Sequence, residues 1–303
     1  MNEYLPGING VEERIVEKEI VLRLYGTALS DIKSALREAA KIPGIKPFLY
    51  GKDNEFLIRL TATSGGAAAS DQLCESAAFI LSEKFGDDIY GRGKSTLAHV
   101  AAGVLIENSA RLATINSDLG EALEAEFATT KRGEHAFCKG DKTYKNGASI
   151  SPSDKTVRDY GANSIQAATE LAFISMKKGK AKYGSAITAP DENGRRWAVV
   201  TQKKHAFVRQ LPPDASKRAC ALAVLDLVRR LVENDSLQSG DSCYKKGRVK
   251  TGKSISPVKS SKKVFVSIFL LIIAVVLGCA CYYYFNIYAP LPDNSAMQVL
   301  IGK

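Results

Sequence analysis

The sequence predicts an α/β protein, with a small βαββα layer, a larger α/β/α domain and one transmembrane helix after them. Three observations lead to this fold class. Segments that alternate like strands are interleaved with segments that have the spacing of amphipathic helices. The composition, with 45% hydrophobic and 24% charged residues, is typical of a globular chain. One long run near the C-terminus contains no charged residue.

The βαββα layer is expected over residues 15–91, after an N-terminal segment of residues 1–14. Its strands alternate apolar and polar residues, and its helices repeat apolar residues every three or four positions. The elements are predicted in this order: a strand at 19–26, a helix at 29–40, two strands within 47–63 that turn at Lys52, Asp53 and Asn54, and a helix at 71–85 with Ser70 as its N-cap.

The larger domain is expected over residues 92–233. Strands that alternate with helices indicate a sheet covered by helices on both faces. The predicted helices are 95–109, a helix that Asn116, Ser117 and Asp118 cap and that runs through Phe127, 160–176 and 215–232. The predicted strands are 111–115, 184–188 and 197–202.

The segment at residues 234–263 is predicted to be a basic linker. It concentrates much of the net charge of +10, so the charge is not spread over the chain like a nucleic-acid footprint. Two interpretations remain open for it, a solvated tether and a segment that binds anionic lipid headgroups. Its basic residues are Lys245, Lys246, Arg248, Lys250, Lys253, Lys259, Lys262 and Lys263.

Residues 264–285 form a run of 22 uncharged residues. At about 1.5 Å per residue this run is long enough to cross a hydrocarbon core of about 30 Å. Basic residues cluster before it, and the tail at residues 286–303 carries only Lys303. We therefore expect a single-pass protein of the cell membrane, with its N-terminal domain in the cytoplasm.

The six cysteines contain no CxxC pair, and there are only three histidines. We therefore expect no metal site and no cofactor, and reduced cysteines that pack in the core.

Several segments, in order, resemble the competence/damage-inducible CinA family. IVLRLYG, LIRLTAT and KFGDDIYG are similar to its KH-like domain, and TLAHVAAGVLIENSARLATINS and KRACALAVLDLVRRLVE are similar to its C-terminal domain. The resemblance covers residues 14–233. It implies a nicotinamide-nucleotide amidase, which hydrolyses the carboxamide of nicotinamide mononucleotide, and a homo-oligomer.

The family's motif is a strand that ends in A-E-S-C-T-G-G, with a serine nucleophile and a downstream tyrosine and lysine. A gapless match implies that Ser117 is the nucleophile, that Tyr144 and Asn146 are retained, and that Ser149 replaces the activating lysine. Another register places Lys142 at the lysine and Phe137 at the tyrosine. The catalytic candidates are thus Ser117, Tyr144 and Lys142, and the substrate-binding candidates are Gly120, Asn146 and Thr188.

A serine hydroxyl is a weak nucleophile unless a base takes its proton, and Ser149 cannot do so. Asp118 and Glu121 would also repel a nucleotide phosphate, and Ser117 has a plainer interpretation as a helix N-cap. The sequence therefore favours a degenerate amidase domain that acts as a binding or scaffold module. The alternative is an active amide hydrolase that uses Ser117.

Nucleic-acid binding is not expected from the KH-like layer. The GxxG loop with which KH domains clamp a nucleic-acid backbone is not found between its elements.

Overall fold

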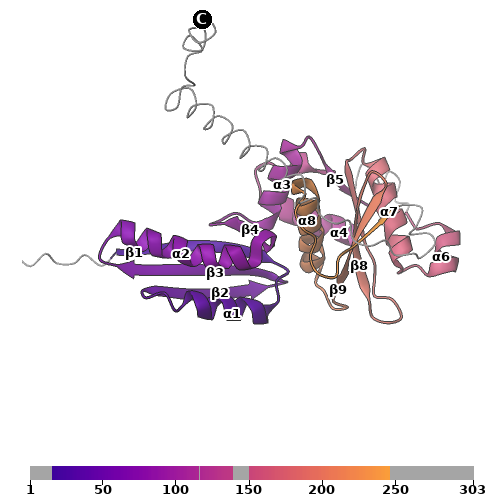
Figure 1. Cartoon of the computed structure of the whole chain (residues 1–303). Coiled ribbons are helices and arrows are strands. Elements are labelled where there is room, and N and C mark those ends of the chain that lie inside the picture. The colour runs from indigo at the N-terminus through magenta and orange to yellow at the C-terminus, as the bar shows by residue number, and fades with distance from the viewer. Residues whose placement is uncertain (1–15, 116, 139–149, 246–303) are drawn as a thin grey trace, which may run out of the picture. The chain divides into compact units, whose positions relative to one another are not determined.

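The first sheet has four antiparallel strands in the order β2-β3-β1-β4 (Figure 1). The computed structural model describes residues 16–115, 117–138 and 150–245. The elements of this first layer are β1 (Val16–Tyr25), α1 (Leu29–Ala39), β2 (Ile45–Lys52), β3 (Glu55–Ser64), α2 (Ala67–Phe85), the short 3-10 helix η1 (Gly86–Asp88) and β4 (Ile89–Arg92).

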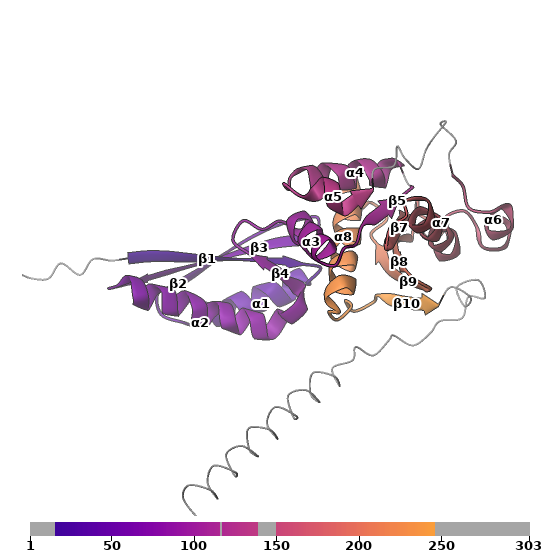
Figure 2. The same ribbon diagram turned by 90° about the horizontal axis from the view of Figure 1, so that it is seen from above.

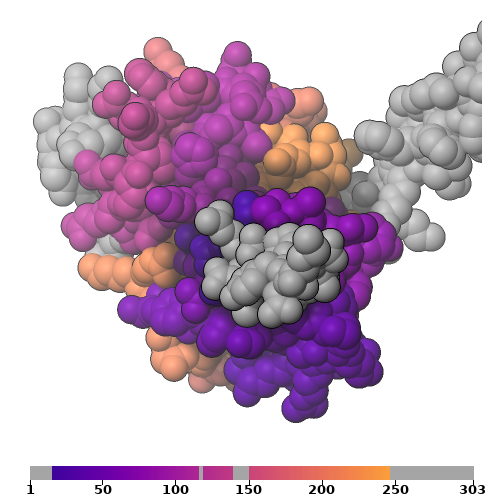
Figure 3. Space-filling view, turned by 90° about the vertical axis from the view of Figure 1, so that its left-hand side faces the viewer, coloured from indigo at the N-terminus to yellow at the C-terminus, as the bar shows by residue number. Residues whose placement is uncertain are grey.

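Helices α1 and α2 cover one face of this sheet (Figure 2). The alternation of each strand sends one set of side chains towards these helices. Leu22, Ile58 and Leu60 from the central strands are fully buried against Ile32 of α1 and Leu81 of α2. The core of the first layer therefore lies between the two helices and this one face. The space-filling view shows the layer end-on, in indigo and purple (Figure 3).

The second sheet has six strands in the order β10-β9-β8-β7-β5-β6. Strands β6, β5 and β7 run parallel, and β7 to β10 pair antiparallel. The elements of this domain are α3 (Leu97–Glu107), β5 (Leu112–Thr114), α4 (Ser117–Ala128), α5 (Gly133–Ala136), β6 (Phe137–Cys138), α6 (Asp154–Tyr160), α7 (Ile165–Lys178), β7 (Tyr183–Ile187), β8 (Arg196–Gln202), β9 (His205–Leu211), α8 (Lys217–Glu233) and β10 (Ser242–Lys245).

Helices pack on both faces of the second sheet. Helices α3, α4 and α8 form one core with Leu112, Ala198 and Val200, whereas Phe173 of α7 forms another with Val199. The α/β part of the predicted fold class is therefore what the structure contains.

Several predicted elements need correction. Helix α2 begins at Ala67, because three alanines extend it, and Ser70 lies inside it instead of capping it. The helix predicted at 160–176 begins only at Ile165, as α7, because Gly161 takes a left-handed φ of 85° and ends a separate helix, α6, that was not predicted. Strands β4, β6, β9 and β10 were not predicted, and β10 lies inside the segment expected to be a basic linker.

The fold class must also be corrected in its membrane part. Of the helices at residues 16–115, 117–138 and 150–245, none has the length and apolar character needed to cross a membrane. The predicted transmembrane helix at 264–285 lies outside the described residues. The fold class that the described residues support is therefore α/β.

A buried charge cluster lies where α8 meets β9. Asp226 is fully buried and accepts hydrogen bonds from Arg209 (2.8 Å), Arg229 (2.9 Å) and Arg230 (2.9 Å). The arginines reach outwards to further acceptors. Arg209 pairs with Asp241 at 2.7 Å. Arg230 pairs with Asp88, the last residue of η1, also at 2.7 Å. The cluster thus joins the two sheets through α8.

Candidate functional site

The candidate site lies at one edge of the second sheet, where three parallel strands end. Leu112 of β5 is paired with Phe137 of β6 and with Tyr183 of β7. Because neighbouring parallel strands point the same way, the carboxyl ends of β5, β6 and β7 lie at the same edge of the sheet. In open α/β sheets ligands bind outside the carboxyl ends of the strands. We call this region the carboxyl edge.

Ser117 follows β5 and is the first residue of α4. The prediction that it caps this helix is therefore wrong by one position, and Asn116 at the preceding position lies outside the described residues. The first backbone N–H groups of a helix have no partner within the helix and favour an anion. The placement suits both an anion-binding residue and a nucleophile beside an oxyanion. The side chain of Ser117 is not described.

Gly120 lies in the first turn of α4, against the end of β5. A Cβ atom built on it would lie 3.5 Å from Thr114 Cγ2, an ordinary van der Waals distance. Alanine would therefore fit at this position. Glu121, next in the chain, pairs with Lys217 at 3.8 Å, so its charge is partly offset.

Thr188 follows β7 at the same edge and is 5% exposed. Its Oγ1 accepts a hydrogen bond from Trp197 N at 3.1 Å, and its N–H donates to Trp197 O at 3.0 Å. These two bonds continue the pairing of β7 with β8. The contacts give Thr188 a role in holding the strand end.

The loop after Thr188 is electrostatically balanced. Asp191 accepts hydrogen bonds from Asn193 N at 2.9 Å and from Arg195 N and Nε at 2.8 Å. Desolvation acts to raise the pKa of Asp191, but the hydrogen bonds from Arg195 and Asn193 hold it below its ordinary value. The loop carboxylate is therefore matched by a cation, and the expected repulsion of a phosphate is reduced.

Sequence reasoning missed a guanidinium at this edge. Arg196 is half-buried and donates from Nε to Thr188 O (3.2 Å) and from Nη1 to Ala215 O (3.0 Å). Both acceptors are neutral carbonyl groups, so the positive charge is held in place without a carboxylate at either bond. The sequence could not reveal Arg196, because nothing in it indicates whether Arg195 or Arg196 pairs with Asp191.

The remaining candidates follow β6. Lys142, Tyr144 and Asn146 lie in the stretch 139–149, outside the described residues. In the chain this stretch follows β6. The competing registers for the activating lysine therefore stay predictions.

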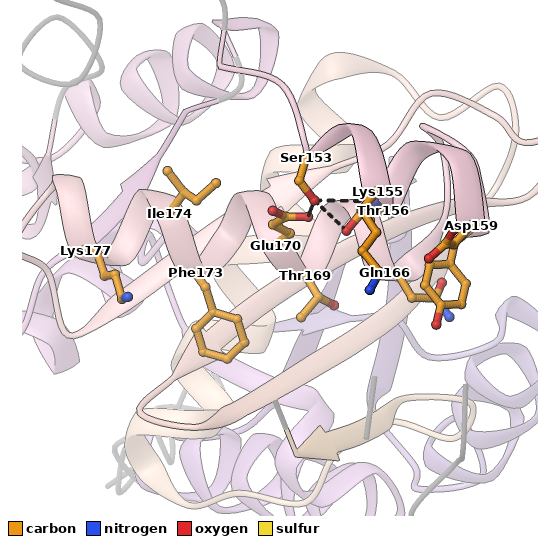
Figure 4. Close-up of a pocket in the computed structure, with 11 residues that line it drawn as sticks. Ser153, Lys155, Thr156, Asp159, Gln166, Thr169, Glu170, Phe173, Ile174 and Lys177 are labelled. Atoms are coloured by element: carbon orange, nitrogen blue, oxygen red, sulfur yellow. Dashed lines mark hydrogen bonds between the residues drawn. The ribbon is translucent and has the colours of Figure 1, made fainter. Parts of the chain in front are cut away.

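Two pockets lie on the α7 side of the sheet, and neither contains a predicted site residue. One, of about 680 Å³, is at the carboxyl edge, between the α6–α7 turn and Asp191, Asn193, Arg195 and Trp197. The other, of about 480 Å³, lies between α6 and α7 (Figure 4). In it Ser153 donates to Glu170 at 3.1 Å, and Thr169 Oγ1 is buried without a hydrogen-bond partner.

We find no candidate metal site in the described part of the chain. There, no histidine, cysteine, aspartate and glutamate side chains gather in a group that could hold a metal ion. The four described cysteines, Cys74, Cys138, Cys220 and Cys243, are buried.

The fold and the carboxyl edge together define an α/β protein in which a helix begins at the carboxyl ends of parallel strands. No family model matches the chain. Among curated proteins, a competence-damage inducible protein of Alkaliphilus metalliredigens is 29% identical over 149 residues, or 48% of this chain and 36% of that protein. A namesake of Clostridium novyi is 28% identical over 174 residues, or 55% and 41%.

These relatives support the assignment of the chain to the CinA family, as a divergent member at low identity. The chain spans about two fifths of the length of the curated relatives that it matches. A CinA superfamily structure from Enterobacter cloacae is 18% identical, with a TM-score of 0.36, and covers 49% of this chain and 97% of its own. A competence or damage-inducible protein from Enterobacter asburiae is 15% identical, with a TM-score of 0.35, and covers 46% and 98%.

Proposed function

We propose that the second domain is related to nicotinamide-nucleotide amidases and acts as a binding module, without amide hydrolysis. One observation carries the proposal. The residue matched to the activating lysine is Ser149, which has no basic group to take the proton of Ser117.

The binding function draws support from the carboxyl edge. The N-terminus of α4 offers backbone donors, and Arg196 adds a fixed positive charge beside Thr188. Asp191 and Glu121 pair with Arg195 and Lys217, which weakens the repulsion of an anionic ligand. These groups suit a ligand with a phosphate or a carboxylate.

An active amidase is the second candidate, favoured by the position of Ser117. A nucleophile at the first residue of a helix has backbone N–H groups near the oxyanion that forms on attack. Activity would require a relocated lysine, such as Lys142, to act as the base.

Ammonia release from nicotinamide mononucleotide by the full chain separates the two candidates. We expect no release above background, and equal traces for the wild type, Ser117→Ala and Ser76→Ala. Ser76 is a matched control because it is exposed on α2, where its hydroxyl donates to Gln72 O at 2.8 Å.

Turnover that Ser117→Ala abolishes and Ser76→Ala leaves intact would establish the amidase and overturn the binding module. Calorimetric titration with the same nucleotide then tests binding by itself. Heat of binding in a sample without turnover supports the proposal.

A further inference from the structure

The face of the first sheet that points away from α1 and α2 carries an exposed patch on β2. Ile45 is buried on the helix side, and the residues that alternate with it point the other way. They are Lys46, Phe48, Tyr50 and Lys52, all exposed.

Two aromatic rings on this face are unusually open to solvent. The side chain of Phe48 is 51% exposed and that of Tyr50 is 67% exposed. As residues two apart on one strand they lie about 6.6 Å from each other. This is about twice the 3.4 Å rise per nucleotide of a stacked strand. Two neighbouring bases that are spread apart therefore match the spacing of the rings.

Basic side chains surround the two rings. Phe48 is paired across the sheet with Arg59, whose guanidinium lies 4.8 Å from the ring centroid. Leu57, opposite Tyr50, is in turn paired with Arg23 of β1. With Lys46 and Lys52 on β2, the rings thus have cations on two sides.

The carboxylates at the adjacent hairpin are already bound by a cation of the second domain. Asp53 and Glu55 lie 3.4 Å and 2.7 Å from the guanidinium of Arg218. This one guanidinium offsets only part of the two negative charges, and the four basic side chains Lys46, Lys52, Arg59 and Arg23 keep the net charge near the rings positive. Glu17 and Glu19 lie on the same face of β1, and Glu19 is level with Lys46 across Thr61, so the positive charge is concentrated towards the hairpin, around Phe48, Tyr50 and Lys52.

We propose that this patch, formed by Lys46, Phe48, Tyr50, Lys52, Arg59 and Arg23, binds single-stranded nucleic acid. Bases stack on Phe48 and Tyr50, and the arginines and lysines contact phosphates. A four-stranded sheet with exposed aromatic rings is a recurrent platform for unpaired bases. The missing GxxG loop does not oppose the proposal, because that loop serves a different binding mode.

Fluorescence anisotropy with labelled RNA and DNA oligonucleotides of about twelve pyrimidines tests the proposal on the full chain. We expect Phe48→Ala and Tyr50→Ala each to weaken binding by about tenfold. The matched control is Phe79→Ala, which removes a side chain that is 63% exposed on α2, and it should bind like the wild type. Comparing the affinities for RNA and DNA shows which of the two nucleic acids the patch prefers.

Salt dependence separates this patch from the basic residues at 245–263. Phe48→Ala and Tyr50→Ala remove no charge, so they should lower affinity without changing the salt slope. Arg59→Ala should reduce the slope by about one. Two outcomes would overturn the proposal. One is equal affinity for the oligonucleotides in all four variants, Phe48→Ala, Tyr50→Ala, Arg59→Ala and Phe79→Ala, or no binding by the wild type. The other is self-association of the chain that Tyr50→Ala abolishes, because a second copy would then cover the patch.

Discussion

At the scale of single residues, Asp226 is the carboxylate at the centre of the buried charge cluster. Its side chain is fully buried and receives three guanidinium groups. Burial acts to raise its pKa, but Arg209, Arg230 and Arg229 outweigh burial and hold that pKa below its ordinary value. Arg229 Nε is buried without a partner, so even the intact cluster is not fully satisfied.

Asp226→Asn is expected to lower the free energy of unfolding by about 3–5 kcal/mol, because it leaves buried guanidinium charges uncompensated. Urea denaturation measures the loss. Glu38→Gln is the control, since Glu38 pairs with Lys41 on the exposed surface of α1 and should leave the urea midpoint unchanged. A loss for Asp226→Asn no larger than for the control would contradict the central role of this carboxylate.

Acid should remove the contribution of Asp226 to the free energy of unfolding. The pKa of Asp226 lies below its unfolded value of about 3.9, so its stabilisation is fully present above that pH. It is lost as the pH falls through the folded pKa. Between pH 5 and pH 2 the wild type should therefore lose stability more steeply than Asp226→Asn. Parallel curves would show that other carboxylates dominate the acid transition.

The sequence shows Asp226 as an acid in the middle of a largely apolar helical segment, with Arg229 and Arg230 within one turn of it. Local spacing is enough to predict those two pairs. It is not enough to predict Arg209, which belongs to β9, or the contact of Arg230 with Asp88. These contacts arise only when separate elements meet.

At the scale of elements, β7 and α7 pack without a gap at Gly184. A Cβ atom on Gly184 would overlap the carbonyl oxygen of Ala172 in α7. Backbone atoms cannot yield as a flexible side chain does. The lack of a side chain at Gly184 therefore sets how closely α7 packs on β7.

Gly184→Ala is expected to destabilise the fold by about 2 kcal/mol or more, in the range of overpacked cores. Gly103→Ala is the matched control. Gly103 lies inside α3, and a Cβ atom there would meet nothing within 4 Å. It should gain about 0.5–1 kcal/mol from the higher helix propensity of alanine. Equal effects of the two variants in thermal unfolding would rule out close packing at Gly184.

Periodicity predicted most helices and the strands with clear alternation. It missed β9, because the β8–β9 hairpin turns at Lys203 and Lys204 without glycine or asparagine, and Lys203 takes a left-handed φ of 51°. It missed β10, because a short strand inside a basic segment looks like a solvated linker. Strand β10 is defined by its pairing with β9 and not by its own sequence.

At the scale of the whole molecule, Arg218 ties the first layer to the second domain. Its guanidinium lies 2.7 Å from Glu55 of β3 and 2.9 Å from Glu126 of α4. One side chain at the start of α8 thus contacts elements from both domains. The sequence predicted the two domains separately, but nothing in local patterning indicates which residues lie between them.

A double-mutant cycle of Glu55→Gln and Arg218→Gln should give a coupling free energy of about 0.5–1 kcal/mol, because the pair is only partly buried. Urea denaturation of the wild type, both single variants and the double variant measures it. Additive losses would mean that the two side chains do not interact in solution.

Ser117 and Thr188 lie at the same edge of the second sheet, because they follow β5 and β7, which are parallel neighbours. Their roles at that edge stay predictions. Sequence could not find Arg196, whose position depends on the pairing of β7 with β8. The competing positions for the lysine lie outside the described residues.

The pairing of β10 with β9 has a practical consequence for anyone who shortens this chain. Cys243 of β10 is buried, and Tyr244 packs on the core formed by α7. A version that stops at the end of α8 would leave the backbone groups of β9 without partners along a whole border. Such borders recruit strands from other molecules, so the shortened protein would be prone to aggregate. Expression boundaries therefore belong beyond Lys245.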